Sequence, residues 1–308
     1  MSPTEAKRPD FFIIGAMKAG TTAIATILAE QAGIAFSAPK EPSLLMRHDY
    51  VGMNPTFRPP MDGIENAYAR CFAHSKPGDL LGEGSTAYFA DAMSPSMVRD
   101  VNAEAKIIAV LREPISRTKS AFEYSRSVFQ EEADSLDEAI REELAGMRAM
   151  FWPNLRYLEY SNYPRHLKAW KANTRPGHLM LLEFEEFVFQ PLSTIVAICN
   201  FLGVSAPASL PDRRYANKTV SLDSELNRRI MRFLYGESVI KSFLKAIVPQ
   251  ATRYRMKIST QDRLASRPGE HFEVSKYAMN RMREQFAHVE SELYTEFGFS
   301  PKHWHSLE

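Results

Sequence analysis

A loop near the start of the chain contains the residue types that bind a phosphate or a sulfate. Gly15 and Gly20 enclose Lys18, and two hydroxyl residues, Thr21 and Thr22, follow at once. Backbone N–H groups, a helix N-terminus and an ammonium can together contact one tetrahedral anion. Because an apolar run precedes the loop and the two threonines can begin a helix, we predict an anion site between a strand and a helix.

The loop resembles the Walker A loop in length but differs in the position of its lysine. In Walker A the lysine directly follows the second glycine, a place that Thr21 takes in this chain. A P-loop nucleotide kinase or NTPase would also have an acidic residue at the end of a second strand, where this chain has Arg112. The sequence therefore disfavours ATP hydrolysis. A simple tight turn with Lys18 in solvent is the alternative for the loop taken alone.

A second segment, from Arg112 to Ser120, has the pattern of another anion site. Arg112 follows an apolar run, and Pro114 suits the first turn of a helix that would carry Ser120. Arginine offers forked donors that match phosphate oxygens, and a serine hydroxyl adds one more donor. The alternative for this segment taken alone is a plain helix start with Arg117 and Lys119 in solvent.

Strands that alternate with helices must position these two segments. Buried strands are predicted from short apolar runs at 11–15, 106–111 and 179–182. Helices are expected to begin at Thr21 and Pro114 and to cover 134–148, 160–173, 191–202, 221–247 and 275–297. Residues 38–79, rich in proline and glycine, are expected to be irregular and to lie beside the site. The alternation predicts an α/β fold, a single domain over residues 1–308 with a central parallel sheet flanked by helices.

Composition limits the class of protein. The chain has 308 residues, of which 44% are hydrophobic, and its 38 basic residues balance 37 acidic ones. It can bury a large core, and its net charge gives no reason to expect nucleic acid or an anionic membrane as partner. Cys71 and Cys199 lack the spacing of a zinc site or a disulfide framework, which favours a reducing cytoplasm. We expect residues 1–9 to form a flexible N-terminus, and the apolar run ending before Lys18 is too short to span a membrane.

The first loop resembles a known one. In sulfotransferases that use 3′-phosphoadenosine 5′-phosphosulfate (PAPS), specifically in the heparan-type and bacterial branch, a strand is followed by Gly-x-x-Lys-x-Gly-Thr-Thr. The segment FFIIGAMKAGTT matches this pattern throughout. The resemblance implies that the 5′-phosphosulfate of the donor binds to Lys18, Ala19, Gly20, Thr21 and Thr22.

The second segment is similar to the 3′-phosphate motif of the same superfamily, R-x-P-x-x-R-x-x-S after a buried strand. LREPISRTKS contains that motif in full, which implies that Arg112 and Ser120 bind the 3′-phosphate. Two motifs in the expected order arise by chance much less often than one. The resemblance implies a P-loop-like sulfotransferase fold and in-line sulfuryl transfer from PAPS, which leaves 3′-phosphoadenosine 5′-phosphate (PAP), without a metal.

Two glutamates are candidates for the general base that takes the acceptor's proton. Lys40-Glu41-Pro42 resembles the superfamily's KEP segment, where the glutamate is the base, although Ser43 begins a different continuation here. GEGSTAYF resembles the segment E-K-[ST]-P-x-Y-[FL], and in it Glu83 could be the base or an anchor of the loop. The superfamily's lysine and proline are replaced here by glycine and threonine. His48 and His74 are less favoured bases, because single loop histidines are mostly at the surface.

The remaining expectations concern the acceptor and a closing loop. Members of the superfamily usually cover the adenine and the 3′-phosphate with a late basic loop, for which the chain offers two sets: Arg213, Arg214 and Lys218, or Arg253, Arg255 and Lys257. The acceptor would present a hydroxyl or an amine, on a carbohydrate or a small metabolite. The rival functions are a P-loop nucleotide kinase or NTPase and a non-catalytic module that binds anions or carbohydrates. The sequence does not encode the oligomeric state.

Overall fold

The computed structural model of the chain describes residues 7–50, 62–128, 130–210 and 274–304. They form an α/β domain around a five-stranded parallel sheet with the strand order β2-β3-β1-β4-β5. The strands are β1 (Phe11–Gly15), β2 (Ile34–Phe36), β3 (Leu80–Glu83), β4 (Lys106–Leu111) and β5 (Leu179–Glu183).

The two strands that precede the predicted anion segments are neighbours at the centre of the sheet. Every residue of β1 is buried, and so is every residue of β4 after Lys106. Their register pairs Phe12 with Ile107 and Ile13 with Ile108. A strand covered on both faces needs apolar residues at successive positions, which explains why neither run alternates. Because parallel strands end at the same edge, the loops after β1 and β4 lie side by side.

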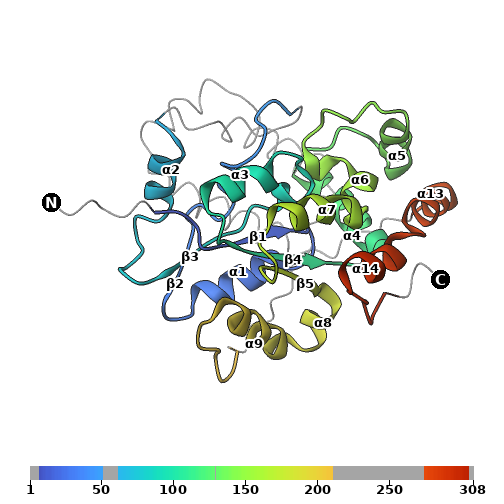
Figure 1. The fold of residues 1–308 in the computed structure, drawn as a ribbon. Coiled ribbons are helices and arrows are strands. Elements are labelled where there is room, and N and C mark those ends of the chain that lie inside the picture. Colours follow the sequence, from blue (N-terminus) through green and yellow to red (C-terminus); the bar gives the residue numbers. More distant parts are fainter. Residues whose placement is uncertain (1–6, 51–61, 129, 211–273, 305–308) are drawn as a thin grey trace.

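Helices cover both faces of this sheet. In Figure 1, α1, α8 and α9 lie on one face, and α3, α6 and α7 lie on the other. The helices described are α1 (Thr21–Ala29), α2 (Ile64–Cys71), α3 (Ser94–Val101), α4 (Pro114–Ser127), α5 (Leu136–Leu144), α6 (Tyr157–Ser161), α7 (Tyr163–Asn173), α8 (Phe184–Phe189), α9 (Pro191–Leu202), α13 (Lys276–Phe286) and α14 (Val289–Phe297), with 3-10 turns η1 (Thr86–Ala90) and η2 (Pro153–Leu155).

The predicted α/β fold and its central parallel sheet are confirmed, and several boundaries are corrected. The helix expected at 160–173 is two helices, because Asn162 leaves helical geometry and Pro164 lacks the N–H that a continuous helix would use. The helix expected at 275–297 is divided at Ala287 and His288. The helix expected at 221–247 lies outside the described residues.

The segment 38–79 was expected to be irregular, and this expectation is wrong for its later part. Helix α2 occupies it and buries Ala67, Tyr68 and Cys71, a helical spacing that the many prolines and glycines of the segment hide. Strand β3 was also not predicted. It is short, and its Gly82 has no room for a side chain, because a Cβ there would come within 2.2 Å of the Phe11 ring.

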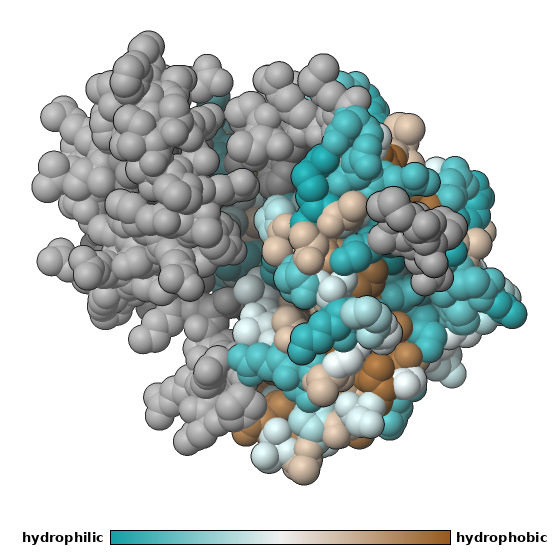
Figure 2. Space-filling model, turned by 90° about the vertical axis from the view of Figure 1, so that its left-hand side faces the viewer, coloured by the Kyte–Doolittle hydropathy of each residue, from teal (hydrophilic) through white to brown (hydrophobic). Residues whose placement is uncertain are grey.

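The N-terminal segment, the cysteines, the helices and the surface of the described residues add four facts. Lys7 donates to the carbonyl of Phe72 at 2.7 Å, so part of the N-terminus expected to be flexible contacts the domain. Cys71 and Cys199 are both buried and unpaired. Among the described helices, none combines the length and apolarity that a membrane crossing requires. On the face drawn in Figure 2, hydrophilic and hydrophobic residues are interspersed.

Candidate functional site

The loop between β1 and α1 leaves a helix N-terminus open. Gly20 is the N-cap of α1 and has a left-handed φ of 75°, which glycine adopts without a steric penalty. Its missing side chain also matters, because a Cβ there would lie 3.0 Å from the Phe184 ring. Among the described side chains, none caps α1, and its first turn holds no acidic residue. The first N–H groups of α1 are therefore available to an anion.

Lys18 lies in this loop as a half-buried cation. Its φ of 70° is left-handed, an uncommon conformation for a residue with a side chain. Its Nζ lies 4.5 Å from the centre of the Tyr124 ring, a cation–π contact. Burial lowers the pKa of Lys18 to about 8, with a further lowering from Arg112 that Glu123 opposes. An anion bound here would stabilise the charged form.

Arg112 joins the second predicted segment to the first. Its Nη1 donates to the carbonyl of Lys18 at 3.1 Å, and its guanidinium lies 5.0 Å from the centre of the Phe184 ring. The buried Nε has no hydrogen-bond partner among the described residues. Ser120 follows on α4 and is 9% exposed. The structure thus brings the Lys18 loop and Arg112 into direct contact.

The N-terminus of α4 is capped by a side chain, whereas no described side chain caps that of α1. The Glu113 carboxylate accepts the N–H groups of Ile115 and Ser116 at 2.8 and 2.7 Å. Arg117, the other arginine of the segment, is fully buried and donates to Ser161 Oγ at 2.6 Å and to the Tyr157 carbonyl at 2.9 Å. Burial lowers its pKa. Arg117 therefore fastens α4 to α6, which rules out the alternative of a plain helix start with Arg117 in solvent.

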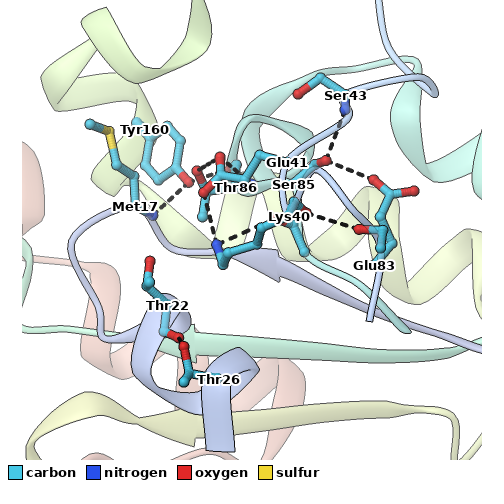
Figure 3. A network of polar contacts seen from close by, with 12 residues as sticks. Met17, Thr22, Thr26, Lys40, Glu41, Ser43, Glu83, Ser85, Thr86 and Tyr160 are labelled. Carbon is cyan, nitrogen blue, oxygen red and sulfur yellow. Dashed lines mark hydrogen bonds and ion pairs between the residues drawn. The ribbon is translucent and has the colours of Figure 1, made fainter. Parts of the chain in front are cut away.

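Glu41 is held from two sides at the edge of the site. Its Oε1 accepts from Lys40 Nζ at 2.8 Å, and its Oε2 accepts from Thr86 Oγ1 at 3.0 Å. The side chain is 36% exposed. Figure 3 shows Lys40 and Glu41 directed toward the side on which Met17 and Thr22 lie. A partly exposed carboxylate beside the anion loop could take a proton from a bound acceptor.

Glu83 has the opposite environment. It is fully buried at the end of β3. Ser85 Oγ donates to its Oε1 at 2.7 Å, and the Tyr68 hydroxyl donates to its Oε2 at 2.5 Å. Burial raises the pKa of Glu83 to about 7, while the hydroxyl donors oppose this shift. Ser85 Oγ in turn accepts the Ser43 N–H at 3.0 Å, so Glu83 supports the loop that carries Glu41 (Figure 3).

Three residues to which the sequence assigned no role, Tyr124, Tyr160 and Thr86, complete the site. Tyr124 holds Lys18 and lies one helical turn after Ser120, a spacing that could have indicated it. Tyr160 accepts the Met17 N–H at 2.9 Å and donates to the Thr86 carbonyl at 2.7 Å. Tyr160 and Thr86 come from segments far apart in the chain, so no local pattern could have paired them.

The structure does not favour the two histidines over the glutamates as the base. His74 is exposed, and His48 is half-buried. The two basic sets, Arg213, Arg214 and Lys218, and Arg253, Arg255 and Lys257, lie outside the described residues.

Among the described residues, Glu183, Glu186 and His303 form a group that could hold a metal ion, with ligand atoms within 4.8 Å of one another. Glu183 already accepts the backbone N–H groups of Lys302 and His303 at 2.9 and 2.7 Å. The Trp304 indole N–H donates to Glu185 at 3.1 Å. These contacts fasten the C-terminal segment to the end of β5 and the start of α8.

Relatives of this chain are found among curated sulfotransferases. The human bifunctional heparan sulfate N-deacetylase/N-sulfotransferase 3 is 27% identical over 224 residues, which cover 70% of this chain and 24% of that protein. The mouse heparan sulfate glucosamine 3-O-sulfotransferase 3B1 is 21% identical over 196 residues, which cover 64% of this chain and 46% of that protein. The chain thus spans less than half the length of these relatives.

The fold and a family model agree with these relatives. The sulfotransferase from Alicyclobacillus acidocaldarius superposes with a TM-score of 0.68 at 21% identity and covers 96% of this chain and 98% of its own. The model of the sulfotransferase domain matches residues 8–229, a range that includes both anion segments and both candidate glutamates. The chain therefore belongs to the sulfotransferase domain family.

Proposed function

We propose that this chain transfers a sulfuryl group from PAPS to a hydroxyl or an amine of an acceptor. The observation that carries the proposal is the contact of Arg112 with the Lys18 carbonyl at 3.1 Å. This hydrogen bond joins the segment with the residues of a 5′-phosphosulfate loop to the segment with the 3′-phosphate motif, at one edge of the sheet. The open N-terminus of α1 and the unpartnered Nε of Arg112 fit a nucleotide that has one anionic group at its 5′ position and another at its 3′ position.

The 5′-phosphosulfate would bind between Lys18 and the first N–H groups of α1. Lys18 stabilises the charge that develops on the 5′-phosphate as the acceptor oxygen or nitrogen attacks sulfur in line. Gly20 contributes a backbone N–H group, and Ala19 lines the loop with its own N–H donated to the Ala16 carbonyl at 3.1 Å. Thr21 and Thr22 orient the sulfonate. Arg112 and Ser120 hold the 3′-phosphate, which fixes the other end of the donor.

Glu41 accepts the proton that the acceptor loses. It is the better base of the two candidates, because its side chain is 36% exposed whereas Glu83 is fully enclosed by its hydrogen-bond donors. We assign Glu83 to anchoring the loop after β3. No step of this scheme requires a metal ion.

The acceptor is proposed to be a carbohydrate or a small metabolite. The curated relatives are named for heparan sulfate, and this chain shares less than half of their length. We further propose that the 308 residues act as one domain and that the protein works in the cytoplasm, in keeping with two unpaired, buried cysteines. Nucleic acid is not an expected partner.

Calorimetry with PAP and with ATP, each with and without Mg²⁺, tests the proposal. We expect PAP to bind without metal and more tightly than ATP. A preference for ATP with Mg²⁺ would favour a nucleotide kinase and overturn the proposal. Transfer of labelled sulfate from PAPS to water or to a de-N-sulfated heparan chain then separates an enzyme from a non-catalytic binding module, which would bind PAP and release no sulfate.

A further inference from the structure

Thr86 occupies a place where the sulfotransferase pattern has proline, and all its polar groups are engaged. It is 4% exposed and begins η1. Its hydroxyl donates to Glu41 Oε2 at 3.0 Å, and its backbone N–H approaches the same oxygen at 3.4 Å. A proline could make neither contact, because it lacks both a hydroxyl and an N–H. These two contacts with Glu41 are therefore impossible in a sulfotransferase that has proline at this position, and they distinguish this chain from that pattern.

The other end of Thr86 is connected to the anion loop. Its carbonyl accepts the Tyr160 hydroxyl at 2.7 Å, and Tyr160 accepts the Met17 N–H at 2.9 Å. The Tyr160 hydroxyl also lies against Gly15, where an added Cβ would come within 3.0 Å of it. Only Thr86 and Tyr160 thus separate the Glu41 carboxylate from the backbone that precedes Lys18 (Figure 3).

The Tyr160 ring is itself fixed from two sides. The Arg117 guanidinium lies 4.6 Å from its centre, and the Phe89 ring lies 5.5 Å away. Arg117 and Tyr160 are both fully buried. A side chain in such packing has few alternative rotamers, so Tyr160 is a rigid link between the loop after β1 and the loop after β3.

We propose that Thr86 is a positioning residue that sets the orientation of Glu41 relative to the sulfuryl donor loop. This inference rests on the proposed function. Thr86 and Lys40 hold one carboxylate oxygen each, so the side chain keeps one orientation while part of it faces solvent. Because proton transfer requires the base within hydrogen-bond reach of the acceptor, a freely rotating Glu41 would spend less time in the productive geometry.

Paired substitutions at Thr86 separate its hydroxyl from its volume. Thr86→Val keeps the shape and the backbone groups but removes the hydroxyl, and Thr86→Ser keeps the hydroxyl. The readout is the release of labelled sulfate from PAPS, with water and with a de-N-sulfated heparan chain as acceptors. We expect kcat to fall roughly tenfold in Thr86→Val, the usual cost of losing a hydrogen bond to a charged group. In Thr86→Ser, which keeps the hydroxyl, kcat should stay close to the wild-type value. The KM for PAPS should be unchanged in both variants.

Three controls make the outcome specific. Thr194→Val changes another buried threonine, whose hydroxyl donates to the Gln190 carbonyl of its own helix at 3.2 Å, and should leave kcat unchanged. Glu41→Gln should lose at least ~10²-fold, the contribution of a general base. Affinity for PAP, measured by calorimetry, should be equal in wild type and Thr86→Val.

The outcomes distinguish the inference from the proposed function. Wild-type kcat in Thr86→Val, or an effect on KM alone, overturns the role of Thr86. Wild-type kcat in Glu41→Gln overturns the assignment of the base instead. If no variant releases sulfate, a crystal structure of Thr86→Val still decides, because the Glu41 carboxylate is expected to leave its wild-type position and an unmoved carboxylate contradicts the inference.

Discussion

The two strand-to-helix junctions at the centre of the sheet, β1 to α1 and β4 to α4, differ in how the N-terminus of the helix is capped. After β1, the N-terminus of α1 has no side-chain cap among the described residues, and Lys18 is the charged group of the loop. After β4, the Glu113 carboxylate occupies the first N–H groups of α4, and Arg112 precedes it. An anion at the first junction can use the backbone and an ammonium, whereas an anion at the second must rely on side chains.

This difference indicates how one nucleotide could be held in a single direction. In the proposed function, the open junction suits the reacting phosphosulfate, because the helix N–H groups and Lys18 can both stabilise negative charge as it develops. The capped junction suits a phosphate that is only bound, because the forked donors of Arg112 supply affinity and orientation. Substitutions that affect one junction and spare the other test this division.

Removing the cation of the open junction should have the largest effect. Lys18→Ala is expected to lower turnover by ~10²–10³-fold, because charge on the leaving phosphate loses its nearest cation. Release of labelled sulfate from PAPS measures it, with thermal unfolding to verify the fold. The matched control is Lys76→Ala, at an exposed lysine in a turn. More than about a tenth of wild-type turnover in Lys18→Ala would be incompatible with its role.

The pH dependence of PAP affinity above pH 7 should come mainly from the open junction. The pKa of Lys18 is about 8 in the unliganded protein, so the ammonium is largely present at pH 7 and largely lost at pH 9. Arginine stays protonated over this range. Affinity for PAP should therefore fall by about tenfold from pH 7 to pH 9, since bound phosphate favours the charged form.

Calorimetry at the two pH values measures this change. Lys18→Ala supplies the reference, because its affinity should be weaker and nearly independent of pH. An equal affinity of the wild type at pH 7 and pH 9 would show that Lys18 does not contact the ligand through its charge.

Opening the capped junction should have the smallest effect on function. Glu113→Ala is expected to lower the free energy of unfolding by about 1 kcal/mol, as for the loss of a helix cap, and to leave PAP affinity nearly unchanged. Glu113→Gln keeps one acceptor oxygen and should lose less stability. Denaturant unfolding and calorimetry provide the two readouts. A large loss of PAP affinity at unchanged stability would mean that Glu113 acts on the ligand rather than on α4.

Local patterns predicted the junctions well because their geometry is local. An apolar run, a glycine turn and a helix start lie within about a dozen residues, and backbone preferences largely decide such units. The same reasoning missed Tyr124, although its one-turn spacing from Ser120 was readable. It also left open an Arg117 in solvent, because an arginine after a helix start is usually exposed, whereas α6 supplies Ser161 and a carbonyl as buried partners.

The sequence by itself determined the parallel α/β architecture, the open loop with Lys18 and the strand-end arginine, since each depends on neighbouring residues. Tertiary structure alone decided that Arg112 reaches the Lys18 carbonyl, that Glu83 is enclosed while Glu41 stays partly exposed, and that Thr86 and Tyr160 connect Glu41 to the loop. These relations join segments up to 143 residues apart. The burial of a side chain and its distant hydrogen-bond partners depend on how strands and helices pack together. The residues next to each site in the sequence do not specify that packing.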